Sequence, residues 1–258
     1  MGAGELKIDA RRQRILEELN REGRVVVSEL AKELNATTVT IRSDLDALER
    51  DGYLERIQGG AVQKLQNFYN LEYQMRNRIN SEEKRAIAAA AAACIRDGET
   101  LFINSGSTTY FTAAALKKHK NLSVVTNSLA VAMELGAVPT FHVVLLGGEM
   151  NVQYAFTYGS EALEHLRRYK ADTAILSLDG VSAESGITTH HAQETLLDKL
   201  MVERAVRTIV TADHSKLDHE GFSLICEASQ IAMLVTDQES PRDVCEKLRE
   251  LGVEVRFG

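Results

Sequence analysis

The stretch VSELAKELNATTVTIRSDLDAL, residues 27–48, decides the fold of the first part of the chain. Its apolar residues recur at helical spacing in two blocks, Val27, Leu30, Ala31 and Leu34, then Ile41, Leu45 and Leu48. Only a few residues around Asn35 separate the blocks. We expect Ser28 to cap the first helix and Thr37 or Thr38 to cap the second. Two short helices joined so tightly must cross steeply, as in a helix-turn-helix.

The sequence on both sides extends this pair to a winged helix. Upstream, Ile15, Leu16 and Leu19 form another helical stripe. Downstream, residues 53–57 alternate like a strand, Gly59 and Gly60 make a turn, and residues 61–63 return. A helix-turn-helix followed by a hairpin is a winged-helix module, which we assign to residues 1–63.

The outward face of the helix after Thr37 carries small or polar side chains, which let a helix enter the major groove of DNA. Free backbone N–H groups at its start favour phosphate, and wing residues reach the backbone or the minor groove. Ala47 also falls on this outward face, with Asp46 on its flank. The candidate DNA-binding residues are Thr37, Thr38, Val39, Thr40, Arg42, Ser43, Arg56 and Gln58. A winged helix that binds protein is the alternative reading of the pattern.

Composition limits the class of protein. The 258 residues are 44% hydrophobic and 26% charged, which is typical of a globular chain and excludes disordered and fibrous classes. The formal net charge is −7, of which residues 1–62 contribute only −2. DNA affinity must therefore depend on a few well-placed cations and on several copies binding together. The chain lacks a long apolar run and a signal segment, so we expect a cytoplasmic protein.

Residues 64–80 have no clean period, and we interpret them as a connector. An alanine-rich helix capped by Ser81 is predicted to follow and to end at Asp97 and Gly98. Apolar β-branched runs then alternate with helical patterns. The runs are 100–104, 122–126, 141–146, 173–178, 207–212, 231–236 and 253–257, and the helices are 108–118, 128–136, 160–168, 192–206 and 241–250. Residues 81–258 are thus predicted to form an α/β domain, a mostly parallel sheet with helices on both faces.

The loop NSGSTT, residues 104–109, follows a predicted strand and opens a predicted helix. Its backbone N–H groups and hydroxyls are the groups that converge on a phosphate at the carboxyl edge of a sheet. Alone, the loop is equally consistent with an ordinary strand-to-helix cap.

Three motifs resemble the DeoR family of bacterial transcriptional regulators. They are R-x3-I-x3-L from Arg11 to Leu19, T-x2-T-I-R-S-D-L at 37–45, which begins after seventeen intervening residues, and the wing sequence GYLERIQGGAV at 52–62. The resemblance implies a regulator, most commonly a repressor of a carbohydrate-catabolism operon. It further implies binding to operator DNA as a dimer or tetramer and control by a phosphorylated sugar.

The effector domain of this family is similar to ribose-5-phosphate isomerase and glucosamine-6-phosphate deaminase. In that fold a lysine near the start of the leading helix, a GST-type loop and a lysine in a D-x-S-K segment hold phosphate. The matching positions here are Lys84, which lies 23 residues before Ser107, the loop itself, and Lys216 in DHSK. Asp179 matches the first acid of an isomerase motif, and Asn127 and Glu194 match pocket positions. The implied effector-binding residues are Lys84, Ser105, Gly106, Ser107, Thr108, Thr109, Asn127, Asp179, Glu194 and Lys216.

A sugar-phosphate isomerase or deaminase with an appended DNA-binding module is the alternative function. The position of the second acid in the isomerase motif is Ser182, and no Lys-Gly-x-Gly segment follows. Proton transfer between sugar carbons would then lack its acid/base pair. We therefore expect no catalytic residues, no cofactor and no metal. His190 and His191 have no acidic or cysteine partner at a ligand interval, and we expect them at the pocket edge or on the surface.

Overall fold

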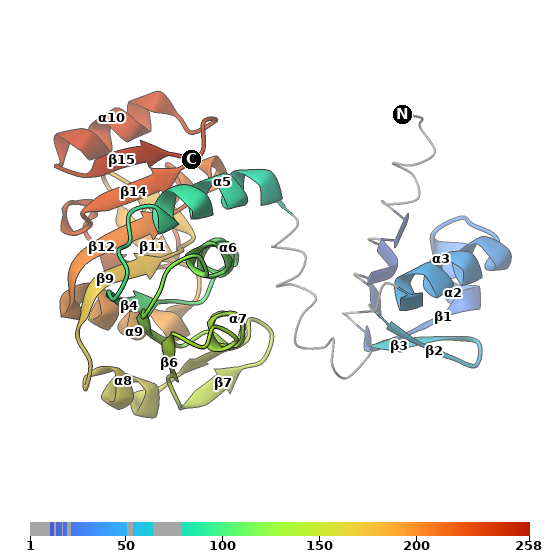
Figure 1. Ribbon diagram of the computed structural model, residues 1–258. Helices are drawn as coiled ribbons and strands as arrows, with labels where there is room; N and C mark the ends of the chain where they lie inside the picture. The colour runs from blue at the N-terminus through green and yellow to red at the C-terminus, as the bar shows by residue number, and fades with distance from the viewer. Residues whose placement is uncertain (1–10, 13, 17, 20–21, 51–53, 64–78) are drawn as a thin grey trace. The chain divides into compact units, whose positions relative to one another are not determined.

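The computed structural model describes residues 11–12, 14–16, 18–19, 22–50, 54–63 and 79–258 (Figure 1). The chain divides into two compact units, residues 1–72 and 73–258, which are described separately. No helix among these described residues is long and apolar enough to cross a membrane.

The first unit is a winged helix. The helical residues among 11–22 are followed by β1 (Arg24–Val26), α2 (Val27–Glu33), α3 (Thr38–Arg50), β2 (Leu54–Ile57) and β3 (Gly60–Gln63). The three strands pair antiparallel in the order β1-β3-β2. The predicted stripes meet in one apolar cluster that includes Ile15, Leu30, Ile41, Leu45 and Leu54. The predicted helix-turn-helix and hairpin are confirmed.

Two local predictions in this unit are wrong. Ser28 does not cap α2, because β1 runs straight into the helix and leaves extended Val26 as the N-cap, without a side-chain cap bond. Ala47 does not face outward: it is 7% exposed, because the buried face of α3 is wider than the apolar stripe predicts. Thr37 does act as a cap, since its hydroxyl accepts the N–H of Thr40 at 3.1 Å.

The second unit is built on a seven-stranded parallel sheet in the order β15-β14-β12-β9-β4-β5-β6. Its strands are β4 (Thr100–Ile103), β5 (Ser123–Thr126), β6 (His142–Leu145), β9 (Ala171–Leu176), β12 (Ala205–Thr211), β14 (Met233–Thr236) and β15 (Glu254–Phe257). Each lies in one of the seven predicted runs or overlaps it. The predicted parallel sheet is confirmed.

Helices cover both faces of this sheet (Figure 1). One face is packed by α5 (Ser81–Ala92), α6 (Ser107–Leu116) and α7 (Leu129–Gly136), and the other by α8 (Ser160–Leu166), α9 (Ala192–Arg204) and α10 (Arg242–Glu250). Adjacent side chains of the interior strand β4 alternate between them: Phe102 belongs to the core under α8 to α10, and Ile103 to the core under α5 to α7. Strands apolar on both faces are what such a layered sheet requires.

The start and end of α5 differ from prediction. Its N-cap is Asn80, in the left-handed conformation with φ 51° and without a side-chain cap bond, so Ser81 is the first helical residue rather than the cap. The helix ends at Ala92, five residues before Asp97.

Short strands in the connections escaped the sequence analysis. They are β7 (Glu149–Asn151) with β8 (Phe156–Tyr158), and an antiparallel sheet of β10 (Gly180–Ser182), β11 (Gly186–Thr189) and β13 (Ser223–Cys226). Two short 3-10 helices also occur, η1 (His214–Lys216) and η2 (Ala228–Gln230). These short strands lack the β-branched apolar runs that mark the strands of the parallel sheet.

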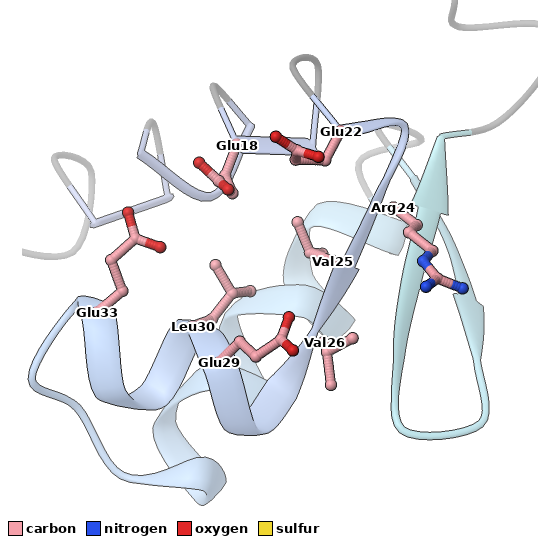
Figure 2. A pocket seen from close by; sticks show the side chains of 8 residues that line it. All are labelled: Glu18, Glu22, Arg24, Val25, Val26, Glu29, Leu30 and Glu33. Atoms are coloured by element: carbon pink, nitrogen blue, oxygen red, sulfur yellow. The ribbon is translucent and has the colours of Figure 1, made fainter.

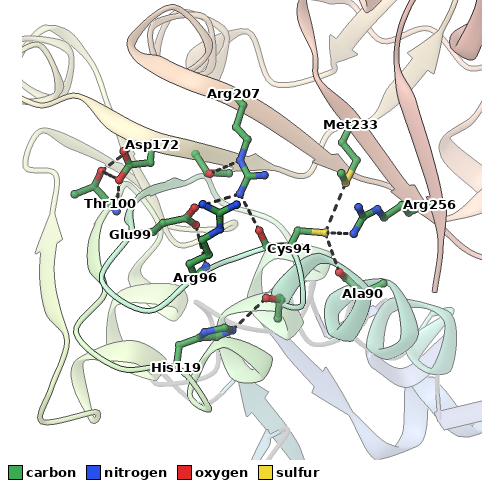
Figure 3. A network of polar contacts seen from close by, with 12 residues as sticks. Ala90, Cys94, Arg96, Glu99, Thr100, His119, Asp172, Arg207, Met233 and Arg256 are labelled. Carbon is green, nitrogen blue, oxygen red and sulfur yellow. Dashed lines mark hydrogen bonds and ion pairs between the residues drawn. The ribbon is translucent and has the colours of Figure 1, made fainter.

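Polar side chains at the amino edge of the parallel sheet bond to one another (Figure 3). The Asp172 carboxylate accepts from the backbone and the hydroxyl of Thr100, at 2.9 and 2.6 Å. Arg207 donates to the carbonyl of Cys94 at 2.8 Å and reaches Glu99 at 3.3 Å. These contacts join β4 to β9 and join β12 to the segment between α5 and β4, so this edge serves the fold.

We predict that Asp44→Ala destabilises the winged helix by about 1–3 kcal/mol, as expected for charge-assisted hydrogen bonds with a buried partner. Asp44 on α3 is 2% exposed and bonds Arg11 and Arg12 of the preceding helical segment. The chain has no tryptophan, so Ile57→Trp at an exposed wing position gives a reporter for this unit in urea unfolding.

Asp46→Ala, on the same helix but with a 60% exposed carboxylate, is the matched control and should cost less than about 1 kcal/mol. Equal losses for the two variants would contradict a structural role specific to Asp44.

Candidate functional site

Polar residues follow the strands of the parallel sheet where each strand ends. Asn104, Asn127, Asp179, Asp213 and Asp237 come after β4, β5, β9, β12 and β14 respectively. Because the strands are parallel, these residues share the carboxyl edge, where open α/β sheets bind ligands.

A cavity of about 90 Å³ lies at this edge. It is lined by Ile79, Lys84, Ser107, Thr108, Ser177, Asp213, Ser215 and Lys216. Four sequence-predicted phosphate residues, Lys84, Ser107, Thr108 and Lys216, are therefore brought together from three separate segments. Gly106 permits this approach, because a Cβ there would lie 2.8 Å from the Cβ of Ser177.

Each lysine of the cavity faces a carboxylate. Lys84 is only 5% exposed, and its Nζ lies 3.8 Å from Oδ2 of Asp213 and donates to the carbonyl of Ile79 at 2.7 Å. Lys216 is half-buried, with Nζ 3.7 Å from Oδ1 of Asp179. A buried cation needs such compensation. The sequence analysis missed Asp213, although the D-x-S-K segment contains it.

Ser105, Asn127 and Glu194 form a second polar cluster at the same edge. Oε1 of Glu194 accepts from Oγ of Ser105 at 2.8 Å and from Nδ2 of Asn127 at 3.3 Å. Glu194 is 5% exposed in the first turn of α9, so it ties this helix to the loop after β4. All three residues were predicted.

Asp179 links the end of β11 to Lys216 of the cavity. Its Oδ2 accepts from Oγ1 of Thr189 at 3.1 Å and from the backbone N–H of His190 at 2.9 Å, while Oδ1 faces Lys216. His190 is exposed, and the ring of His191 lies 4.2 Å from that of Tyr154. His190 is therefore at the surface, one of the two places expected for it, whereas the ring contact of His191 was not predicted.

Thr109 plays a different part from its neighbours in the loop. It is fully buried, and its hydroxyl donates to the carbonyls of Asn104 and Gly106 at 3.0 and 3.1 Å. The side chain braces the loop from within and does not line the cavity.

Asp198 is a buried residue of this edge that the sequence analysis missed. Its Oδ1 accepts from Nδ2 of Asn104 at 3.1 Å, and it lies one helical turn after Glu194, a spacing that is the signal for a shared face. Burial, and then the charge of Glu194, raise the pKa of Asp198 well above its ordinary value. Among the described side chains, Oδ2 of Asp198 and Oδ1 of Asn127 are buried oxygens without a hydrogen-bond partner.

The predicted DNA-facing residues divide into two groups. Thr37, Thr38, Val39, Arg42, Ser43 and Gln58 are exposed, with Val39 at 72%, and Thr40 is half-buried. Arg56 pairs with Asp46 and donates to the carbonyls of Arg42 and Gly60 at 3.2 and 3.1 Å. Its contacts hold the wing against α3.

A second cavity, of about 250 Å³, lies in the first unit. It is lined by Glu18, Glu22, Arg24, Val25, Val26, Glu29, Leu30 and Glu33. Figure 2 shows the carboxylates of Glu18 and Glu22 across the pocket from those of Glu29 and Glu33. Four carboxylates repel phosphate, so this surface is unsuited to DNA.

Comparison with known families decides the identity. Residues 11–66 match the DeoR-like helix-turn-helix domain, and residues 79–238 match the DeoR C terminal sensor domain. The chain belongs to the DeoR family.

Full-length DeoR relatives are transcriptional regulators. The HTH-type transcriptional repressor GlcR of Bacillus subtilis (strain 168) is 32% identical, with 93% of each chain covered. The glycerol-3-phosphate regulon repressor of Escherichia coli (strain K12) is 28% identical over 98% of this chain and all of its own. The HTH-type transcriptional regulator GolR of Listeria innocua is 30% identical, over 96% and 97% of the two chains.

Among solved structures, ribose 5-phosphate isomerase A from Neisseria gonorrhoeae is 21% identical, with a TM-score of 0.40 over 52% of each chain. The translation factor subunit eIF2B delta from Chaetomium thermophilum is 14% identical, with a TM-score of 0.42 over 82% of this chain and 65% of its own. The match therefore spans about half of the isomerase chain.

We predict that Asp198→Asn raises stability at neutral pH. An acid whose pKa is raised on folding keeps its proton in the folded state, so stability falls as pH rises from the ordinary pKa of about 4 toward the raised value, by up to about 1.4 kcal/mol per pH unit. The asparagine keeps the Oδ1 acceptor for Asn104 and removes the titration. Melting temperatures between pH 4.5 and 8 should show an advantage over wild type that grows with pH.

Asp172→Asn is the control of opposite sign. Hydrogen bonds from Thr100 lower the pKa of Asp172. The ionised carboxylate therefore contributes to folding stability at pH values above its ordinary pKa, and the Asp172→Asn variant should be less stable than wild type in that range. A difference in melting temperature between Asp198→Asn and wild type that does not change with pH would refute the raised pKa of Asp198.

Proposed function

We propose that this DeoR-family regulator is a repressor of a carbohydrate-catabolism operon, and that a phosphorylated sugar bound to its second unit relieves repression. The observation that carries the proposal is the cavity where Lys84, Lys216 and the Ser107–Thr108 loop converge from three segments. A phosphate dianion requires cations together with hydroxyl and backbone donors, and this cavity combines them.

The neighbouring cluster suits the sugar portion of the effector. Hydroxyl groups need acceptors, and Glu194, Asp179 and Oδ1 of Asn127 present oxygens at the same edge. An unsatisfied buried oxygen is costly unless a ligand or water bonds it. Asp179 faces Lys216 of the phosphate cavity, with its Oδ1 3.7 Å from the lysine Nζ.

The first unit supplies the operator contacts. Val39, Arg42 and Ser43 are exposed along α3, which enters the major groove. Because residues 1–62 have no cationic surplus, we propose a homo-oligomer, a dimer or tetramer whose paired winged helices match operator half-sites. We also propose that the protein is cytoplasmic, where its operator DNA lies. The names of the relatives, which include repressors, support this role.

We also propose that the sensor unit does not catalyse a reaction. Ser182, at the position of the second acid in the isomerase motif, is buried in β10, and its hydroxyl bonds Glu184 at 3.2 Å. A serine in this position cannot act as the second carboxylate of an acid/base pair.

We predict that Lys216→Ala weakens binding of the effector by about 10- to 100-fold, the cost of about 1.5–3 kcal/mol for one charge-assisted hydrogen bond to phosphate. A thermal-shift screen of sugar phosphates with wild type identifies the ligand, and calorimetry measures both proteins. Lys170→Ala, an exposed lysine beside the amino edge, should bind as wild type does. Equal binding by all three proteins would remove Lys216 from the site.

We predict that Arg42→Ala weakens operator binding and lowers the slope of log affinity against log salt by about one, because one phosphate contact is lost. DNA fragments selected from a genomic library by the wild-type protein serve as the probe in anisotropy titrations. The control is Arg50→Ala, in the last turn of α3, where Arg50 donates to the carbonyl of Asp46. A salt slope unchanged by Arg42→Ala would place this arginine away from the phosphates.

A further inference from the structure

Lys84 contacts the chain at the point where it enters the second unit. Nζ donates to the carbonyl of Ile79 at 2.7 Å, and the backbone N–H of the same lysine donates to the carbonyl of Asn80 at 3.0 Å. One residue therefore holds both peptide carbonyls of the Ile79–Asn80 turn.

The turn is a defined local structure and not a continuation of the helix. Asn80 adopts the left-handed conformation, with φ 51° and ψ 42°, immediately before α5 begins at Ser81. This conformation is sparsely populated by residues other than glycine, although asparagine tolerates it best. Contacts from Lys84 help to maintain it.

The same lysine and the same turn line the phosphate cavity. Ile79 is a lining residue with 59% of its surface exposed, and Lys84 is a lining residue that is almost fully buried. Of the described residues that line this cavity, Ile79 alone precedes α5; the remainder belong to α5, to α6 or to the connections after β9 and β12. It lies at the end of the predicted connector, residues 64–80.

We propose that the Ile79–Asn80 turn responds to the occupancy of the phosphate cavity. This inference rests on the phosphate site of the proposed function. A phosphate in the cavity attracts the Lys84 ammonium, which also donates to the Ile79 carbonyl, so the bound anion, the lysine and the turn form one continuous chain of contacts. The turn closes over the occupied cavity, and binding is passed to the last two residues of the predicted connector.

Ile79→Trp tests the response in the full-length protein, because the natural chain contains no tryptophan. Inorganic phosphate is the probe, titrated at constant ionic strength, and binding is followed independently by ³¹P NMR. Closure of the turn should shift the emission of the new tryptophan to the blue and lower its quenching by acrylamide, a neutral quencher, with the same saturation as the NMR signal.

Two further variants serve as controls for the fluorescence response. Val206→Trp, an 86% exposed position at the start of β12, should give no response because it lies at the other edge of the sheet. Lys216→Ala in the Ile79→Trp background should lose both phosphate binding and the fluorescence response. A response that survives without binding would refute the proposal.

Hydrogen exchange of the wild-type protein avoids any perturbation by the new tryptophan. Phosphate should slow exchange of the Lys84 amide, because closure stabilises its hydrogen bond to the carbonyl of Asn80. Bound phosphate with neither a fluorescence response nor slower exchange would overturn the turn's role and leave the proposed effector site intact. Failure of the wild-type protein to bind phosphate or any sugar phosphate would overturn both.

Discussion

The parallel direction of all seven strands is the constraint on which the second unit depends. It places the carboxyl ends of all seven strands at one edge. Residues that are far apart in sequence, such as Asn104 and Ser177, therefore come within hydrogen-bonding distance. At the amino edge the polar side chains are paired with one another. At the carboxyl edge two buried oxygens have no protein partner among the described residues. This difference between the edges is what makes the carboxyl edge the candidate binding site.

The electrostatics of the winged helix explain how an acidic chain serves as a DNA-binding protein. Several of its cations are engaged within the unit: Arg11 and Arg12 bond Asp44, and Arg56 pairs with Asp46. Four glutamates surround a pocket in the same unit. These internal pairs leave fewer cations among the described residues of the unit to face DNA, so the placement of each remaining cation matters more for affinity.

The elements of the fold were predictable where a local pattern decides them. Phe102 and Ile103 lie in an apolar run that reads as a buried strand without any tertiary information, and Thr37 caps α3 as its sequence position suggests. The prediction that Ser28 caps α2 was wrong because the chain enters α2 directly from β1, a strand that pairs with β3 of the wing. The sequence carries no local signal for such a pairing.

The residues of the candidate site also fall into those that a local motif predicts and those that it does not. Lys84, Ser107 and Lys216 were found because they lie in motifs, whereas Asp198 and Ser177 were missed because their roles arise from contacts across the fold. The bond between Asn104 and Asp198 joins residues 94 positions apart. No periodicity or motif within either segment reports such a distant partner.

The pairing of each site lysine with a carboxylate determines how the cavity discriminates among ligands. The separations of 3.8 Å for Lys84 and Asp213 and 3.7 Å for Lys216 and Asp179 exceed hydrogen-bonding length. Each carboxylate therefore compensates its lysine without a short direct bond, and a ligand must contribute enough negative charge to compete with it. A neutral sugar offers no such charge, while a phosphate dianion offers two, so in the proposed site these pairs are expected to favour phosphorylated ligands over neutral ones.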